Sequence, residues 1–173
     1  LALIAMLVVG ALAGATGLPE EDGREEILQF GLSGNPDTLD PHTTSGTLTF
    51  QTIRSFYDTL VEPDRSGELV PALAQGWDVS DDSLVWTFTL RDGVRFHNGD
   101  AFTSADVKAT FERLVDPETA SPKASEFAAI EAIETPDSST VVFRLSEPSA
   151  PLLASMASGW GAILPESLIE SGH

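Results

Sequence analysis

Residues 69–99, LVPALAQGWDVSDDSLVWTFTLRDGVRFHNG, carry the strongest secondary-structure signals in the chain. Within residues 84–91, Leu, Trp, Phe and Leu occupy the even positions, and Val, Thr, Thr and Arg occupy the odd ones. Such period-two alternation predicts a strand with one apolar face. Trp77 and Val79 alternate in the same way before an acidic, serine-rich turn at residues 80–83. The stretch therefore predicts a hairpin of two strands.

Two tight turns and a helix follow this hairpin. Asp92-Gly93 and Asn98-Gly99 are turn pairs on either side of a short predicted strand at residues 94–96. Residues 103–106, Thr-Ser-Ala-Asp, fit a capping box at the start of a helix. Apolar residues then recur at i, i+4 and i+7, and a proline follows. This pattern predicts an amphipathic helix over residues 104–114.

The rest of the chain predicts a second hairpin and several shorter elements. Residues 129–135 and 140–145 indicate the two strands of that hairpin, although the alanine-rich residues 124–132 could instead form a helix. A helix is expected over residues 47–60, capped near Ser45 or Thr47. The other expected elements are a first strand over residues 27–32, a helix over residues 148–156, a strand over residues 160–164 and the first turn of a helix over residues 165–170.

Acidic residues dominate the composition. The chain has 27 Asp plus Glu against 9 Lys plus Arg, a formal net charge of −18. Such a surface repels nucleic-acid phosphates and anionic lipid headgroups, so neither is an expected partner. The acids are spread along the chain, which favours a role in solubility over a role in ligand choice.

The first 17 residues are apolar and uncharged. This length suits the core of a signal peptide better than a membrane span, which needs about 20 apolar residues. Small residues around Ala13 and Ala15 predict cleavage there, with a mature start between residues 14 and 18. The basic n-region and a starting Met are missing, so a natural start upstream is expected. A buried apolar helix is the alternative interpretation.

The chain contains no cysteine, which excludes disulfides, thiolate metal ligands and a lipid anchor on cysteine within it. A periplasmic or secreted location is therefore expected. His42, His97 and His173 are far apart in sequence, so no metal site is predicted. Catalytic and nucleotide-binding motifs are also missing, and no cofactor is expected. Composition and periodicity alone predict an exported mixed α/β domain.

Several segments, in order, resemble one family. The residues 69–80 and 86–99 within the opening stretch resemble the signature of family 5 extracellular solute-binding proteins. That family includes the dipeptide-, oligopeptide- and nickel-binding components of ABC importers. The other matching segments are residues 38–41, 57–61, 101–107 and 142–145 with Pro148. The aromatic and turn residues of these motifs are mostly scaffold, since they suit a core layer and tight turns.

The resemblance implies an α/β fold, namely the N-terminal part of a two-lobed periplasmic-binding-protein (type II) fold with a mixed sheet and hairpins. Residues 18–173 would form that part, truncated before the second lobe. It also implies a protein that is not an enzyme but captures di- or oligopeptides for a membrane permease and ATPase. A monomer is expected. The alternatives are a nickel chelate, an opine, glutathione or an oligosaccharide as ligand, or a sensory or surface role. An exported hydrolase would need a nucleophile or paired acids in the missing part.

Two short segments are expected to face the ligand. The first is the loop that follows Leu-Asp-Pro, and the second precedes the predicted strand at residues 160–164. The resemblance implies cleft contacts at both places, and loops between strands and helices are where α/β folds present ligand-binding groups. An ordinary helix cap and a core Trp are the alternative. The candidate residues are His42, Thr43, Thr44, Ser45, Gly159 and Trp160, with Ser158 beside them.

Overall fold

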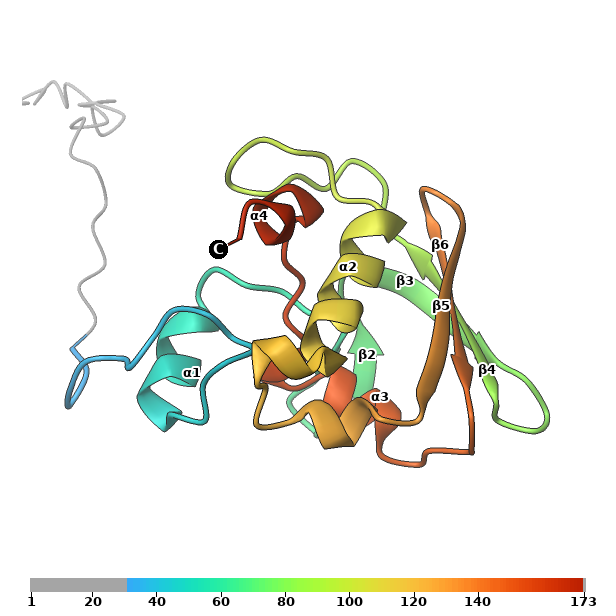
Figure 1. Cartoon of the computed structure of the whole chain (residues 1–173), viewed down its shortest axis with the longest axis horizontal. Coiled ribbons are helices and arrows are strands. Elements are labelled where there is room, and N and C mark those ends of the chain that lie inside the picture. Colours follow the sequence, from blue (N-terminus) through green and yellow to red (C-terminus); the bar gives the residue numbers. More distant parts are fainter. Residues whose placement is uncertain (1–30, 173) are drawn as a thin grey trace, which may run out of the picture. The chain divides into compact units, whose positions relative to one another are not determined.

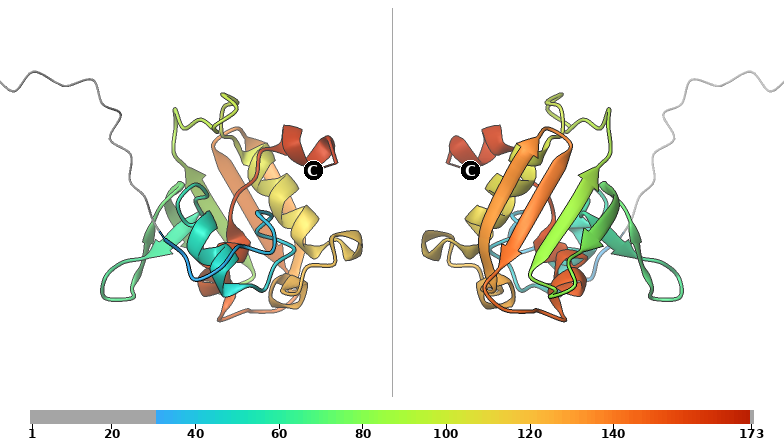
Figure 2. Two further views of the ribbon diagram at one scale, coloured as in Figure 1. Left: turned by 90° about the vertical axis from the view of Figure 1, so that its left-hand side faces the viewer. Right: turned by 90° about the vertical axis from the view of Figure 1, so that its right-hand side faces the viewer.

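A four-stranded antiparallel sheet, in the order β3-β4-β6-β5, forms one layer of the fold (Figures 1 and 2). The computed structural model describes residues 31–172, and residues 32–172 belong to one compact unit. The predicted leader and most of the predicted first strand lie outside the described residues. The strands are β3 (Ala74–Val79), β4 (Val85–Leu90), β5 (Ile130–Asp137) and β6 (Thr140–Leu145).

Both predicted hairpins are confirmed. Trp77 of β3 pairs with Phe88 of β4, and Ile133 of β5 pairs with Phe143 of β6. The expected mixed sheet is wrong for the described residues, because every strand pairing there is antiparallel. Short turns join the strands within each hairpin, and a parallel neighbour would require a crossover instead. The sheet becomes continuous where β4 pairs antiparallel with β6.

Helix α2 (Ser104–Val115) covers one face of the sheet (Figure 2). Thr103 and Asp106 form the predicted capping box, which satisfies backbone N–H groups at the helix start. The apolar side of α2 is fully buried, and its Phe111 packs edge-to-face on Phe143 with ring centroids 5.1 Å apart. The predicted helix is confirmed and ends one residue beyond the prediction, before Asp116.

Helix α1 (Thr47–Ile53) is shorter than the predicted helix over residues 47–60. Its N-cap residue is Gly46, and no side chain caps it, so the predicted hydroxyl cap is absent. After α1 the chain turns away and enters β1 (Val61–Pro63), which pairs antiparallel with β2 (Leu69–Pro71). No sequence pattern predicts this small hairpin, because three-residue strands are too short to show periodicity.

The C-terminal segments are less regular than expected. The predicted strand at residues 160–164 is wrong: its first part is a turn of 3-10 helix, η3 (Gly159–Gly161). Beyond it, Ile163 N–H donates to Asp58 O at 2.9 Å and Leu164 N–H to Thr110 Oγ1 at 3.0 Å, so the backbone bonds two different elements. The predicted strand at residues 94–96 is reduced to one bridge, Arg95 with Ala101. The remaining elements are η1 (Pro117–Thr119), η2 (Ala124–Phe127), α3 (Leu152–Met156) and α4 (Glu166–Glu170).

Candidate functional site

The two segments predicted to face the ligand lie against each other. Trp160 donates its indole Nε1–H to the carbonyl oxygen of Thr44 at 2.9 Å. Phe50 of α1 packs edge-on against the Trp160 ring, with centroids 4.4 Å apart. The loop after Leu-Asp-Pro (residues 42–45) therefore lies against residues 158–160, and these two segments together form the candidate surface. Ligand binding by this surface stays a prediction, but the structure brings its two halves together.

The loop residues differ in what they can offer to a ligand. Thr43 and Ser45 are exposed, whereas His42 and Thr44 are fully buried. The Thr44 hydroxyl donates to the Asp37 carboxylate at 2.9 Å and accepts the Gly46 N–H, also at 2.9 Å. Of the predicted hydroxyls, those of Thr43 and Ser45 are therefore the accessible ones. Ser45 does not cap α1, which removes the capping explanation for this residue.

Asp37 connects the loop to α1 through hydrogen bonds to both. Its carboxylate accepts the hydroxyls of Thr49 and Thr44. These hydrogen bonds, first that from Thr49 and then that from Thr44, hold the pKa of Asp37 below its usual value. The carboxylate is thus charged at neutral pH and fixes the side of the loop that faces α1.

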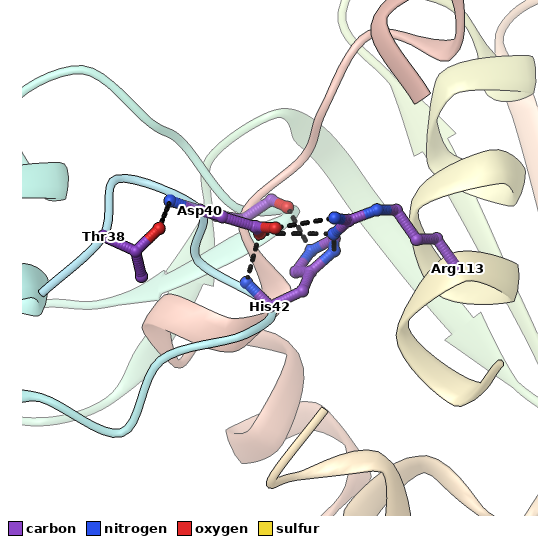
Figure 3. A network of polar contacts seen from close by, with 5 residues as sticks. Thr38, Asp40, His42 and Arg113 are labelled. Atoms are coloured by element: carbon purple, nitrogen blue, oxygen red, sulfur yellow. Dashed lines mark hydrogen bonds and ion pairs between the residues drawn. The ribbon is translucent and has the colours of Figure 1, made fainter. Parts of the chain in front are cut away.

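A second polar network holds the start of the loop (Figure 3). Arg113 of α2 donates to Asp40 and to the His42 Nδ1 atom, and Asp40 Oδ1 accepts the His42 N–H at 2.9 Å. Burial lowers the pKa of His42 to about 4, and the charge of Arg113 acts in the same direction. Burial acts to raise the pKa of Asp40, but hydrogen bonds from Arg113 and from the His42 N–H more than offset it, so this pKa is lowered.

Gly159 has a structural reason to lack a side chain. A Cβ atom there would lie 2.4 Å from the Phe50 ring. The close approach that this glycine permits is therefore with Phe50, which in turn packs on Trp160. Gly159 also lines a cavity of about 220 Å³ together with Tyr57 and Ala162.

Lys123 lies beside the candidate site, and no local pattern in the sequence indicates it. Its Nζ lies 4.8 Å from the centre of the Trp160 ring and forms an ion pair with Glu126. Glu126 in turn accepts the Ser155 hydroxyl at 3.1 Å. Residues 117–128 carry no clear periodicity, so only the tertiary contact with Trp160 identifies Lys123. A cation, an indole ring and the loop hydroxyls thus come from three separate segments.

The described part of the chain offers no cluster of three or more His, Asp or Glu side chains arranged to hold a metal ion. No helix within residues 31–172 is long and apolar enough to span a membrane. A second cavity, of about 260 Å³, is mainly apolar and lies between Tyr57, Phe96 and Leu168. It does not include the residues predicted to bind ligand.

Comparisons with known proteins agree with this architecture. "Probable D,D-dipeptide-binding periplasmic protein DdpA" of Escherichia coli K12 is 33% identical over 171 residues, covering 92% of this chain and 32% of its own. Among solved structures, AgaA of A. tumefaciens R10 in complex with agropinic acid superposes with a TM-score of 0.77 at 36% identity, over 80% of this chain and 28% of its own. Haemophilus influenzae OppA, in complex with the peptide RPPGFSPFR, gives a TM-score of 0.73 at 29% identity, over 79% of this chain and 30% of its own.

The chain thus spans about a third of the length of the curated relative. The structural matches confirm a mixed α/β fold that corresponds to part of a periplasmic binding protein. The family described as "Bacterial extracellular solute-binding proteins, family 5 Middle" matches residues 68–170, which is more than half of the chain. This is a family of solute-binding proteins and not of enzymes. The chain belongs to family 5 of the bacterial extracellular solute-binding proteins.

Proposed function

We propose that this chain is part of the substrate-binding component of an ABC importer and captures di- or oligopeptides outside the cytoplasmic membrane. One observation carries the proposal: Trp160 contacts both the loop of Thr43 to Ser45, through Thr44, and Lys123. An apolar ring and a cation thus lie beside a loop that carries two exposed hydroxyls. Such a combination of one apolar wall and a few placed polar groups is typical of small-molecule sites.

A peptide suits these groups chemically. The exposed Thr43 and Ser45 can donate or accept hydrogen bonds with peptide amides and carbonyls, directly or through water. Lys123 offers a charge for a peptide carboxylate, moderated by its ion pair with Glu126. Trp160 gives an apolar side chain a surface on which to pack. Backbone recognition with tolerant side-chain contacts is the mode by which extended peptides are commonly bound.

The relatives support peptides as the ligand class. One is named for D,D-dipeptides, and one solved structure holds a nine-residue peptide. The importer's permease and ATPase are the proposed partners, and a monomer is the proposed state. We also propose export through the uncharged leader at residues 1–17, with cleavage near Ala13 or Ala15. N-terminal sequencing of the secreted protein tests that part, and retention of residues 1–13 would contradict it.

An opine is the second candidate ligand. AgaA, which is 36% identical and superposes with a TM-score of 0.77, is in complex with agropinic acid. An opine carries carboxylate and polar groups that the hydroxyls and Lys123 can also bind. Because one scaffold serves many ligands in such proteins, the fold itself does not choose between the two classes.

Binding measurements on the natural full-length protein separate the two candidates. Native mass spectrometry would first identify any ligand that copurifies. Calorimetry would then compare Ala-Ala and Ala-Ala-Ala with agropinic acid. We expect at least one peptide to bind and agropinic acid to bind more weakly. Binding of agropinic acid without either peptide would reject the peptide proposal in favour of the opine.

A further inference from the structure

Arg113 connects α2 to the start of the candidate ligand loop. Its Nη2 lies 2.6 Å from Asp40 Oδ2, and its Nη1 lies 3.2 Å from Asp40 Oδ1 and 2.8 Å from His42 Nδ1. The side chains of Arg113 and Asp40 are only 15% and 26% exposed. A two-point contact between guanidinium and carboxylate, shielded from water, is among the stronger and more directional polar contacts in proteins.

The contact with Arg113 also determines how the His42 ring is used. A guanidinium has only donors, so His42 Nδ1 must accept and the ring proton must lie on Nε2. His42 Nε2 faces the carbonyl oxygen of Ala162 at 3.2 Å, to which it therefore donates. Ala162 follows Trp160 by two residues. Arg113 thus acts on both halves of the candidate site, through His42.

We propose that Arg113 is a positioning residue of the ligand site: it holds the loop of residues 42–46 in register with Trp160. This inference rests on the proposed function, because it assigns a role within the same site. The order of contacts is Arg113 to His42, and His42 to Ala162, while Trp160 N–H reaches back to the Thr44 carbonyl. Two hydrogen bonds therefore clamp the loop onto the second segment, and Arg113 orients one of them.

Positioning matters because the loop has no regular structure of its own. Residues 43–45 lie in no helix or strand, and only the Gly46 carbonyl accepts an α1 hydrogen bond, from the Phe50 N–H at 3.2 Å, so regular structure does not keep the Thr43 and Ser45 hydroxyls in place. Groups held in the bound geometry beforehand do not lose conformational freedom on binding. Without the guanidinium, the partly buried Asp40 carboxylate and the His42 acceptor lose their donor, which favours release of the loop.

The test is to measure, by NMR on the full-length protein, how fast the tryptophan indole N–H groups exchange their hydrogen with solvent. Arg113→Lys keeps the charge but removes the planar fork. We expect the Trp160 indole N–H to exchange about tenfold faster or more, because local opening of the loop releases it from Thr44. The Trp86 indole, which donates to Ser83 O at 3.2 Å in the β3-β4 hairpin, reports on the rest of the unit and should not change.

Lys108→Gln is the matched control, because it removes an exposed cation and its pairing with Glu112 from the same helix. It should leave both indoles unchanged. Asp40→Asn is the second variant if Arg113→Lys does not fold, and it should likewise accelerate Trp160 alone. An unchanged Trp160 rate in the folded variant would overturn the proposal. Equal acceleration of Trp160 and Trp86 would also overturn it, since that marks general destabilisation.

A measurement of peptide affinity distinguishes failure of this inference from failure of the proposed function. For a parent protein that binds Ala-Ala-Ala, Arg113→Lys should weaken its affinity about tenfold, with the Lys108→Gln affinity unchanged. An unchanged affinity would overturn the positioning role. Failure of the parent to bind any peptide would reject the proposed function alone, because the indole exchange of Trp160 needs no ligand and still decides whether Arg113 positions the loop.

Discussion

The indole N–H of Trp160 reaches the backbone carbonyl of Thr44 at 2.9 Å, although 116 residues separate them in sequence. The bond uses a main-chain acceptor, so it depends on the path of the loop and not on the Thr44 side chain. That side chain instead turns to Asp37. As a result Thr44 is fixed by its main chain and by its side chain, and the exposed residues Thr43 and Ser45 flank it in the sequence.

Replacement of Ser45 should affect binding more than stability. Ser45 is exposed, so Ser45→Ala is expected to leave the free energy of unfolding within about 0.5 kcal/mol of the parent. Loss of one ligand hydrogen bond should weaken peptide affinity about two- to tenfold in calorimetry. Ser138→Ala, at an exposed turn residue between β5 and β6, is the control. Equal affinities of Ser45→Ala and the parent would argue against Ser45 as a ligand contact.

Replacement of Thr44 should affect stability more than binding. Its hydroxyl is buried against Asp37 and Gly46, so Thr44→Ala is expected to destabilise the protein by about 1 to 2 kcal/mol. Urea unfolding monitored by circular dichroism measures this. A stability equal to that of the parent would show that the Asp37 contact does not hold the loop.

Addition of one methyl group at Gly159 should disturb Trp160 through Phe50. The new Cβ would lie 2.4 Å from the Phe50 ring, so Gly159→Ala is expected to cost about 1 to 3 kcal/mol and to shift the Trp160 fluorescence. The cost of Gly159→Ala should be smaller in a protein that already carries Phe50→Ala, because the clash is then removed. Gly76→Ala, where no atom lies within 4 Å of the added Cβ, is the control. Strictly additive effects of Gly159→Ala and Phe50→Ala would contradict this explanation.

Truncation of the hairpin aromatics should harm folding and not ligand choice. Phe88 is completely buried and packs edge-to-face on Phe143 with centroids 5.6 Å apart. Phe88→Ala is therefore expected to cost about 3 to 5 kcal/mol in thermal or urea unfolding. Trp86, which is only partly buried, should cost less when truncated to Ala. Lost peptide binding at unchanged stability would place these aromatics in the site.

Stability should fall as the pH falls from about 6.5 toward 4. The pKa of His42 is lowered to about 4 in the folded protein, from 6.5 when exposed. Between these values the unfolded chain binds a proton that the folded chain does not, so acid favours unfolding. The shift corresponds to at most about 3 kcal/mol. The lowered pKa of Asp40 adds a further loss at more acidic pH. NMR titration of the His42 ring checks the cause, and titration near 6.5 in the folded protein would contradict it.

Much of the fold could be predicted from the sequence, because its signals are local. The hairpin of β3 and β4 follows from alternating apolar residues around a turn, and α2 follows from a capping box and helical spacing. These features depend on neighbours within a few residues. The sequence alone therefore determined both hairpins, the helix that covers the sheet and the resemblance to a family of solute-binding proteins.

The rest of the fold and of the candidate site depends on contacts between segments that are distant in the sequence. Residues 160–164 have an apolar, strand-like composition, yet Ile163 and Leu164 bond different elements and form no ladder. The position of His42 and Thr44 in the loop makes both possible ligand contacts, but both side chains are buried and bonded inside the protein, His42 to Arg113 and Thr44 to Asp37. The position of Lys123 over Trp160 has no local signal either. Local preference specifies the elements, whereas the pairing of polar groups buried between them specifies which residues stay free to meet a ligand.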